Sequence, residues 1–483
     1  MTTQSQTIIS KKFSGDYRID VLLDDVKFRW NTFSPLGAEV QIPFAFLTTP
    51  ASNASAEDKN GFTPFSAIEM NAVRQILTEI SKLLKITFVE VSETTIQQGI
   101  RFANNIQTDS AGYAMLPQPA EDGKNFLVGS GDLYMASNQI NDPSFAVGTY
   151  EFATLVHEIG HALGLNHPGN YNAGEPPKTE AGNYLASAED NKWISIMSYN
   201  GVAQEQNRSF FGTYDMLALK YLYGSREYNA ENNDYAFVDS HGRILQLIND
   251  TGGIDTIDVS ATSVGAKISL EPGAQSSIGT LADGATPAIN SLSIAYDAII
   301  ENVIGTRFDD TLIGNNADNT LSGGGGNNAI DGRGGHDIAV FAGNRNTYTL
   351  QNKGDGQFLV EKPNSQGSDS LLNVEALKFA DMNINLGVGE KSKTVDANAL
   401  KSLIELYIAY FNRVPDADGM NYWIGEKSAG ANLEQIGQSF YNAAVSPAFT
   451  SLTGYSNEMS NIDFIKIIYK NVLGRNEVDQ GGL

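Results

Sequence analysis

The chain has 483 residues, and 32 Lys+Arg against 56 Asp+Glu give it a formal charge of −24, with no cysteine present. This length exceeds a single hydrophobic core and predicts about three domains. The missing thiols exclude disulfides, thiolate metal sites and cysteine nucleophiles. The negative charge disfavours nucleic acid and anionic membrane surfaces as partners.

The amino-terminal stretch MTTQSQTIISKKFSGDYRID lacks the continuous apolar core of a secretory signal. No later apolar run is long enough to span a bilayer. We therefore expect no membrane span. If the protein is exported, we expect it to leave the cell without a cleaved amino-terminal signal.

The first regular elements are predicted between residues 65 and 103. Ser66 and Glu69 have the spacing of a capping box and predict the start of a helix. The stretches KITFVEV and GIRFA have the apolar patterns of short strands. A second helix over 150–165 completes a mixed α/β domain that we expect to end near Tyr223. The buried stripe of the first helix is predicted as Val73, Ile76, Leu77 and Ile80.

Three of the five histidines of the chain lie in VHEIGHALGLNHPG (156–169), two of them in the second helix and one just after it. At about 100° per residue, its apolar side chains share one side, while His157, Glu158 and His161 share the other. His157 and His161 lie one turn apart and can reach a single metal ion. Gly164 lets the backbone turn sharply, so that His167 can approach the same ion. Three neutral imidazoles leave one tetrahedral position of zinc for water, as in catalytic sites.

Glu158 lies between the two helical ligands in sequence, which favours a role as a base over a role as a ligand. Zinc lowers the pKa of a bound water to about 7, and a nearby carboxylate can accept its proton and later protonate a leaving amine. The motif therefore predicts amide hydrolysis. The alternative is a histidine pair at helical spacing that binds no metal.

The longer pattern HExxHxxGxxH with a downstream Met-turn is the metzincin signature. In this chain the Met-turn is SIMSY, residues 195–199. The resemblance implies that Met197 forms the hydrophobic floor beneath the zinc. It also implies that Tyr199 binds the metal or stabilises the oxyanion.

Composition changes after residue 245, where Gly, Asn and Asp become frequent, and residues 305–340 divide into nonapeptides. These are GTRFDDTLI, GNNADNTLS, GGGGNNAID and GRGGHDIAV. A nine-residue period is typical of calcium-binding parallel β-helices, whereas a Gly-rich linker has no reason to keep one. The sixth positions are Asp310, Asn319, Asn328 and Asp337, and the inward-facing eighth positions are Leu312, Leu321, Ile330 and Ala339.

Helical periodicity returns from about residue 395, in ALKSLIELYIAYF and NLEQIGQSFYNAA. An internal repeat matches LYIAYFNRVPDADGM (406–420) with IYKNVLGRNEVDQGGL (468–483). The first copy continues with Tyr422 and Trp423, whereas the second stops at Leu483. We therefore expect the sequence to end inside a domain.

Together these features make residues 20 to 385 resemble the serralysins, bacterial metzincins that join a zinc endopeptidase to a calcium-loaded β-roll. Pro168 after His167, GNYNAGE (169–175) and DMLALKYLYG (215–224) also carry the resemblance. It implies a multidomain α+β fold. The expected parts are a short propeptide or extension (1–20), a metzincin domain with a mixed sheet (21–228), a β-roll (229–390) and an incomplete all-α repeat domain (395–483).

The resemblance also implies substrate and calcium sites. SAGYAMLP (110–117) resembles the edge strand that pairs with an extended peptide substrate, with an ordinary half-buried strand as the alternative. Because each pair of sixth positions two repeats apart combines Asp with Asn, we expect fewer or weaker calcium ions than is typical. The implied ligands are Asp250, Gly252, Asp255 and Glu301 in one site, and Asp310, Gly323, Gly325 and Asp337 in the nonapeptides.

The predicted function is that of a secreted, monomeric endopeptidase with one catalytic zinc and several structural calcium ions, acting on protein or peptide substrates. The resemblance implies type I export through a carboxy-terminal signal. The helical domain resembles modules of bacterial surface proteins and suggests attachment to the cell surface. Two alternatives stay open: a calcium-dependent surface or adhesion protein with a vestigial protease domain, and a protease held inactive by a protein inhibitor. A missing ligand or base would favour the vestigial reading, and none is missing.

Overall fold

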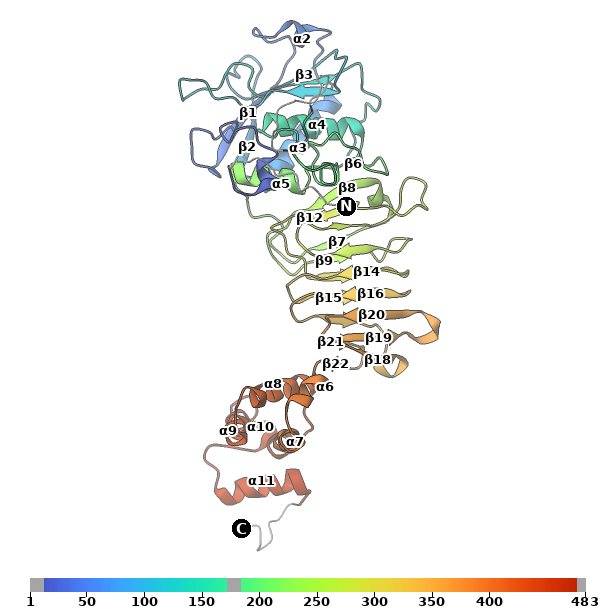
Figure 1. Cartoon of the computed structure of the whole chain (residues 1–483). Helices are drawn as coiled ribbons and strands as arrows, with labels where there is room; N and C mark the ends of the chain where they lie inside the picture. Colours follow the sequence, from blue (N-terminus) through green and yellow to red (C-terminus); the bar gives the residue numbers. More distant parts are fainter. Residues whose placement is uncertain (1–12, 172–183, 476–483) are drawn as a thin grey trace, which may run out of the picture. The chain divides into compact units, whose positions relative to one another are not determined.

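The computed structural model describes residues 13–171 and 184–475 (Figure 1). Its contacts form two units: the first extends to Gly335 and includes Thr349–Leu372, and the second comprises His336–Tyr348 and the chain from Asn373 onward. Most of the predicted propeptide, the last part of GNYNAGE and much of the second helical repeat lie outside the described residues. Those three predictions therefore stay predictions.

The amino-terminal part of the first unit contains a mixed sheet with strand order β2-β1-β3-β5-β4. The first four of these strands pair in parallel, and β4 pairs antiparallel with β5. β4 therefore lies at the edge of this sheet among the described strands. The strands are β1 (Val40–Phe46), β2 (Ile86–Glu90), β3 (Ile100–Asn105), β4 (Gly112–Ala114) and β5 (Asp132–Ala136).

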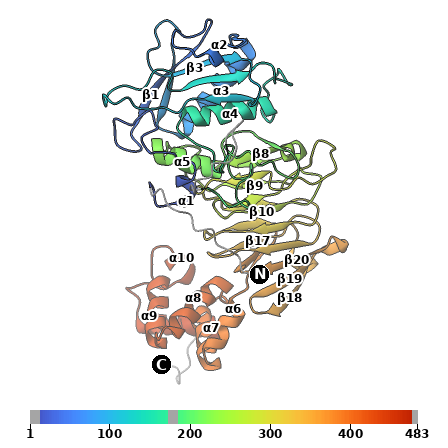
Figure 2. The same ribbon diagram turned by 45° about the horizontal axis from the view of Figure 1, so that its top comes forward.

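Helices α3 and α4 lie alongside this sheet, as Figure 2 shows. The predicted capping box of α3 is confirmed: Glu69 N–H donates to Ser66 Oγ, and Ser66 N–H donates to the Glu69 carboxylate. The predicted stripe of α3 is buried, and both predicted strands are present as β2 and β3. The helices of this part are α1 (Tyr17–Asp20), α2 (Ala56–Lys59), α3 (Ala67–Leu83), α4 (Tyr150–Ala162) and α5 (Thr213–Tyr223).

Helix α4 ends at Ala162, three residues before the predicted end at residue 165. The face with the titratable residues meets another layer and a cleft, so it is covered as well as the apolar face. His157 is 9% exposed and Glu158 is 5% exposed. The covering layer includes β4, which contacts α4. A period of 3.6 residues identifies the apolar face but cannot show that another layer covers the polar one.

The nonapeptide strands alternate between two parallel sheets. β14 pairs with β16, with Leu312 opposite Ile330, whereas β15 pairs with β13 in the other sheet, with Leu321 opposite Val303. All four of these side chains are buried, as predicted for the nonapeptide positions. The strands of the first unit in this region are β6 (Asn207–Arg208), β7 (Asp234–Ala236), β8 (Ile244–Ile248), β9 (Thr256–Asp258), β10 (Lys267–Ser269), β11 (Gln275–Ser276), β12 (Leu292–Ile294), β13 (Asn302–Ile304), β14 (Thr311–Ile313), β15 (Thr320–Ser322), β16 (Asn328–Asp331), β18 (Thr349–Gly354), β19 (Gln357–Glu361) and β20 (Ser368–Leu372).

The second unit joins a short sheet to a set of helices. Its strand β21 pairs in parallel with β17 and antiparallel with β22. The predicted return of helices is confirmed, and their core includes Leu403, Tyr407, Ile424 and Phe440. Within the described residues, no helix combines the length and apolar character needed to cross a membrane. The elements are β17 (Ile338–Val340), β21 (Ala376–Lys378), β22 (Asn383–Asn385), α6 (Val388–Lys391), α7 (Ala397–Phe411), α8 (Ala417–Ser428), α9 (Leu433–Ala444), α10 (Thr450–Thr453) and α11 (Asn461–Leu473).

Candidate metal centre

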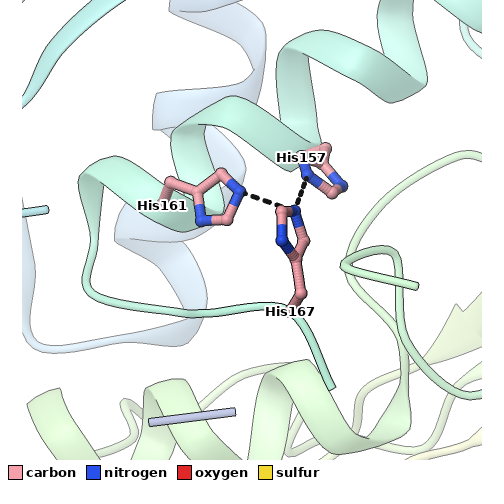
Figure 3. Close-up of side chains that lie close together, drawn as sticks. All are labelled: His157, His161 and His167. Atoms are coloured by element: carbon pink, nitrogen blue, oxygen red, sulfur yellow. Dashed lines mark hydrogen bonds between the residues drawn. The ribbon is translucent and has the colours of Figure 1, made fainter. Parts of the chain in front are cut away.

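Three histidine side chains converge in the first unit (Figure 3). His157 and His161 project from α4 one turn apart, and His167 approaches from the segment that follows the helix. The Nε2 atom of His167 lies 3.2 Å from that of His157 and 3.1 Å from that of His161. The three predicted ligands therefore direct their Nε2 atoms at one point.

The other nitrogen of each helical ligand is held by a backbone carbonyl. His157 Nδ1 lies 2.8 Å from Ile196 O, and His161 Nδ1 lies 2.8 Å from Leu165 O. Because a carbonyl oxygen only accepts, each Nδ1 carries the proton and each Nε2 presents a lone pair. Ligands on tetrahedral zinc with bonds of about 2.05 Å stand about 3.3 Å apart, so the donor set fits this ion.

Burial also favours the neutral imidazoles that metal binding requires. Burial, together with the neighbouring His167, lowers the pKa of His157 to about 3. Burial lowers the pKa of His161 well below its usual value, with the same contribution from its neighbours. A neutral imidazole keeps the lone pair that a metal ion needs.

The turn after α4 brings His167 to the other two ligands. Gly164 has φ +101°, and a Cβ atom there would lie 2.0 Å from Phe28 O. A side chain is therefore excluded by both conformation and space. Asn166 N–H donates to Leu22 O at 2.7 Å, which fixes the outgoing chain just before His167.

Glu158 lies beside the ligands in a buried position. Its Oε2 atom has no hydrogen-bond partner among the described residues, and burial raises the pKa of this carboxyl to about 8. A buried carboxyl group without a partner is costly unless a substrate or water uses it. This placement suits a group that accepts and returns a proton.

Gly112 of β4 lies directly against Glu158, and a Cβ atom there would be 2.9 Å from Glu158 Cγ. The sequence reasoning identified the edge strand but missed the need for glycine at this position. We predict that Gly112→Ala displaces the carboxylate and lowers kcat/KM for a peptide substrate by about tenfold or more. Zinc content should stay unchanged, because Gly112 touches no ligand.

Gly389→Ala is the matched control for this substitution, because no atom lies within 4 Å of a Cβ added there. It should leave kcat/KM and zinc content at the wild-type values. A Gly112→Ala variant with wild-type kcat/KM would show that β4 does not position Glu158.

The Met-turn lies under the histidines. Met197 is fully buried, and a Cβ atom on Gly160 of α4 would lie 2.7 Å from its Sδ atom. Glycine at this position therefore makes room for the methionine. Tyr199 is 44% exposed, and its ring centroid lies 4.4 Å from that of His167. Its ring is therefore beside the ligands, at the open side of the centre.

Two aspartates that the sequence reasoning missed hold the Met-turn. Asp190 accepts hydrogen bonds from the Tyr171 hydroxyl, the Ser198 hydroxyl and the Asn200 amide. Asp215 is fully buried and accepts from Ser195 Oγ, Ile196 N–H and Gly212 N–H at 2.5 to 2.7 Å. The signal for Asp215 was local, since an acidic residue three positions after a helix N-cap is a capping pattern.

We predict that Asp215→Ala lowers the free energy of unfolding by about 4 kcal/mol, because it leaves three buried donors without a partner. Urea unfolding followed by tryptophan fluorescence measures this change. Asp297→Ala is the control: the exposed carboxylate of Asp297 pairs with Lys220 of α5, and its loss should cost less than about 1 kcal/mol. Equal destabilisation by both variants would contradict the role given to Asp215.

The first predicted calcium cluster has features that fit a cation. Asp255 N–H donates to Glu301 Oε2, and Gly252 N–H donates to Asp250 Oδ1. Asp255 Oδ2 is buried with no hydrogen-bond partner among the described residues. Burial, with the charges of Asp250 and Glu301, raises the pKa of Asp255 to about 6. A cation would neutralise this repulsion.

The ligands predicted in the nonapeptides have other partners. The Asp310 carboxylate accepts hydrogen bonds from Ala266 N–H and Thr306 N–H. The carbonyl oxygens of Gly323 and Gly325 accept from the Asn328 amide at 2.9 and 3.0 Å. The calcium ligands expected in the nonapeptides therefore stay a prediction. Asp337 lies in the second unit, where its N–H donates to Glu375.

A cleft of about 500 Å³ opens beside the histidines. Its wall combines the residues before and at the start of β4, the amino-terminal turns of α4 and the Met-turn. The cleft thus joins the predicted edge strand, the base and the ligands in one cavity. The residues that line it include Asp109, Gly112, Tyr150, His157, Glu158, Lys192, Tyr199 and Arg208.

Comparisons with known proteins agree with this geometry. Residues 98–213 match the family described as Metallo-peptidase family M12B Reprolysin-like, and residues 218–427 match Peptidase M10 serralysin C terminal. Serralysin B of Dickeya chrysanthemi is 31% identical over 309 residues, which cover 59% of this chain and 60% of that protein.

Two further relatives show the same extent of similarity. Serralysin A of Dickeya chrysanthemi is 32% identical over 312 residues, with 59% of this chain and 60% of the relative covered. The serralysin of Proteus mirabilis is 30% identical over 310 residues, with 57% and 60% covered. The chain thus spans about 60% of the length of these relatives.

Proposed function

We propose that this chain, which is similar to the serralysins over 59% of its length, is a secreted zinc endopeptidase. The observation that carries the proposal is the convergence of three histidine Nε2 atoms beside the buried Glu158 carboxyl. The vestigial alternative is not favoured, since the ligands and the base are all present.

His157, His161 and His167 would hold the zinc ion. Bound zinc supplies Lewis-acid chemistry, which polarises a carbonyl and makes water more acidic. Glu158 accepts the proton of the attacking water and then donates it to the nitrogen of the leaving amine. The Tyr199 hydroxyl stabilises the oxyanion of the tetrahedral intermediate. Met197 supports the centre from below, and Gly164 permits the turn to the third ligand.

The free edge of β4 binds the substrate in this proposal. An extended peptide would add to the sheet through backbone hydrogen bonds, which recognise many sequences. Protein and peptide chains are therefore the substrate class. The closeness of Gly112 to Glu158 supports this position, because it places the strand beside the base.

The finer parts of the proposal concern the other regions. The alternating parallel sheets would form a β-roll, with calcium bound at Asp250, Gly252, Asp255 and Glu301. The protein would act as a monomer after type I export, and the helical domain would attach it to the cell surface. A protein inhibitor would be a further partner. The domain limits 21–228, 229–390 and 395–483 belong to this proposal.

The test is an assay of the purified full chain on casein and a quenched peptide, before and after removal of zinc by 1,10-phenanthroline. We expect activity to disappear on chelation and to return with one equivalent of zinc. Activity that persists in metal-free protein would refute the proposed mechanism. A zinc-loaded chain that is inactive on every substrate, after removal of copurifying protein, would refute the function.

A further inference from the structure

A buried lysine ammonium group lies where the third nonapeptide was expected to bind calcium. Lys362 Nζ is 2.6 Å from Asp369 Oδ1, 2.9 Å from Gly326 O and 3.2 Å from Gly325 O. The side chains of Lys362 and Asp369 are only 4% and 2% exposed. An ammonium group has three donors, and these acceptors use all of them.

The neighbouring Asn328 completes the same arrangement. Its amide nitrogen donates to Gly323 O and Gly325 O and lies 2.8 Å from Asp369 Oδ1. Its Oδ1 atom accepts from Asp310 N–H. The backbone oxygens and the carboxylate of this turn therefore already have donors from the protein.

Calcium prefers six to eight oxygen ligands, with negative charge among them. At this turn a calcium ion would face an ammonium group and an amide NH₂, both of which repel it. The charge that needs compensation is the carboxylate of Asp369, and Lys362 compensates it directly. The disagreement with the expected calcium site thus has a simple electrostatic cause.

The hairpin β19–β20 brings the lysine to this position. Lys362 follows β19, and Asp369 in β20 lies opposite Asn328 in β16 (Figure 1). Gly367 between the strands has φ +96°, and a Cβ atom there would be 2.2 Å from Gly326 O. Only glycine allows so close an approach of the hairpin to the turn.

We propose that Lys362 is the resident cation of the turn Gly323–Gly326 and that this turn binds no calcium. The turn is then stabilised within the chain itself. Calcium dependence of the repeat region comes from other sites, such as the cluster at Asp250 and Asp255.

Crystals of the full wild-type chain soaked in terbium test the location directly. We expect no anomalous peak between Gly325 O and Asp369. A peak there, with Lys362 displaced, would overturn the proposal. This measurement needs no variant.

Thermal unfolding at saturating calcium tests the energetic role. Lys362→Met should lower Tm by about 10 °C, because it leaves a buried carboxylate without its partner. Lys353→Met is the control, since Lys353 lies in an exposed part of β18 and bonds only Gln351 among the described residues. Equal Tm values for the two variants would overturn the proposal. If Lys362→Met does not fold, Lys362→Arg replaces it in this test. Arginine keeps the positive charge, so this variant should fold. An arginine variant that does not fold, together with a terbium peak at this turn, would overturn the proposal.

An independent observation concerns the catalytic cleft and rests on the proposed function. Lys192 lines the same cavity as His157 and Glu158. Its Nζ atom lies 5.8 Å from the Tyr150 ring centroid and makes no hydrogen bond or ion pair within residues 13–171 and 184–475. Burial lowers the pKa of Lys192, with no contribution from a carboxylate.

Asp109 and Glu158 line the cleft together with Lys192, and neither forms an ion pair with it among the described residues. Asp190 is held by Tyr171, Ser198 and Asn200. Asp109 lines the cleft but is exposed at its rim. The Lys192 backbone is fixed, because the buried Arg208 guanidinium donates to Lys192 O at 3.1 Å. Among the described residues, the Lys192 ammonium is therefore a positive charge in the cleft without an ion-pair partner.

The position of Lys192 relative to the scissile bond follows from the geometry of α4. Tyr150 precedes His157 by seven residues, which corresponds to about 10 Å along α4. An extended peptide covers this distance with about three residues. We infer that Lys192 binds an acidic side chain of the substrate within about three residues of the cleaved bond.

Quenched peptides that carry Glu at each position in turn, compared with Gln at the same position, test this inference. Wild type should cleave one Glu peptide about tenfold faster, in kcat/KM, than its Gln partner. Lys192→Gln should abolish that preference, so that the Glu and Gln peptides are cleaved with equal kcat/KM, and Lys192→Arg should retain the preference. The matched control Lys59→Gln, at an exposed position, should leave the preference intact. The inference is overturned if the wild type shows no preference for a Glu peptide, or if Lys192→Gln keeps the wild-type preference. If the wild type cleaves none of the peptides, the proposed function is refuted instead.

Discussion

Replacement of Glu158 by Gln is expected to lower kcat for peptide hydrolysis by about a thousandfold while zinc remains bound. Glutamine keeps the size of the side chain but cannot accept the proton of the attacking water. Glu158 is not among the groups that converge as ligands, so metal content should not change. Stopped-flow or quenched-peptide kinetics, together with zinc analysis of the same sample, measure both quantities.

The control for this variant is Glu121→Gln, which changes an exposed carboxylate in a loop. It should keep the wild-type kcat. A Glu158→Gln protein with one zinc ion and wild-type kcat would show that another group acts as base. A loss of zinc together with activity would instead make Glu158 a structural support of the site.

Replacement of His167 by Ala is expected to weaken zinc binding by more than about a hundredfold and to abolish activity. His167 is the ligand that joins the two helical histidines, since its Nε2 atom is within 3.2 Å of both of theirs. Without it the ion keeps two protein ligands and an open coordination shell. Competition with a fluorescent zinc chelator gives the affinity, and casein hydrolysis gives the activity.

His336→Ala is the matched control, because His336 is exposed and lies outside the metal motif. It should bind zinc as tightly as the wild type. Thermal unfolding of both variants in zinc-free buffer separates loss of a ligand from loss of structure. Wild-type zinc affinity in folded His167→Ala would refute the three-histidine centre.

The fold of the first unit was predicted in part from local patterns. Ser66 and Glu69 identified the start of α3, because a capping box depends on residues three apart. The nine-residue period identified the nonapeptide strands and their buried side chains, because parallel strands repeat a local geometry. The sequence could not show that β4 covers α4, since those elements are separated by a long stretch of chain.

For the candidate site, the sequence predicted the metal ligands and the base but not the residues that support them. The ligands and the base lie within eleven residues, where helical geometry alone brings two of them together. No local spacing indicates the contacts of Asp190 and Gly112, and the capping position of Asp215 indicates its bond to Gly212 but not its contacts with the Met-turn. The calcium ligands in the nonapeptides were predicted from position only, and the donor that occupies their turn comes from a hairpin more than thirty residues later.

What the sequence determined by itself was the chemistry available to this protein. His157, Glu158, His161, Gly164 and His167 are close in the chain, so backbone geometry relates their positions directly. Tertiary structure decided the surroundings: the burial of Glu158 under β4, the aspartates that hold the Met-turn, and the lysines at 192 and 362. The reason is physical, because burial and electrostatic pairing depend on which distant segments meet, and only the folded chain brings them together.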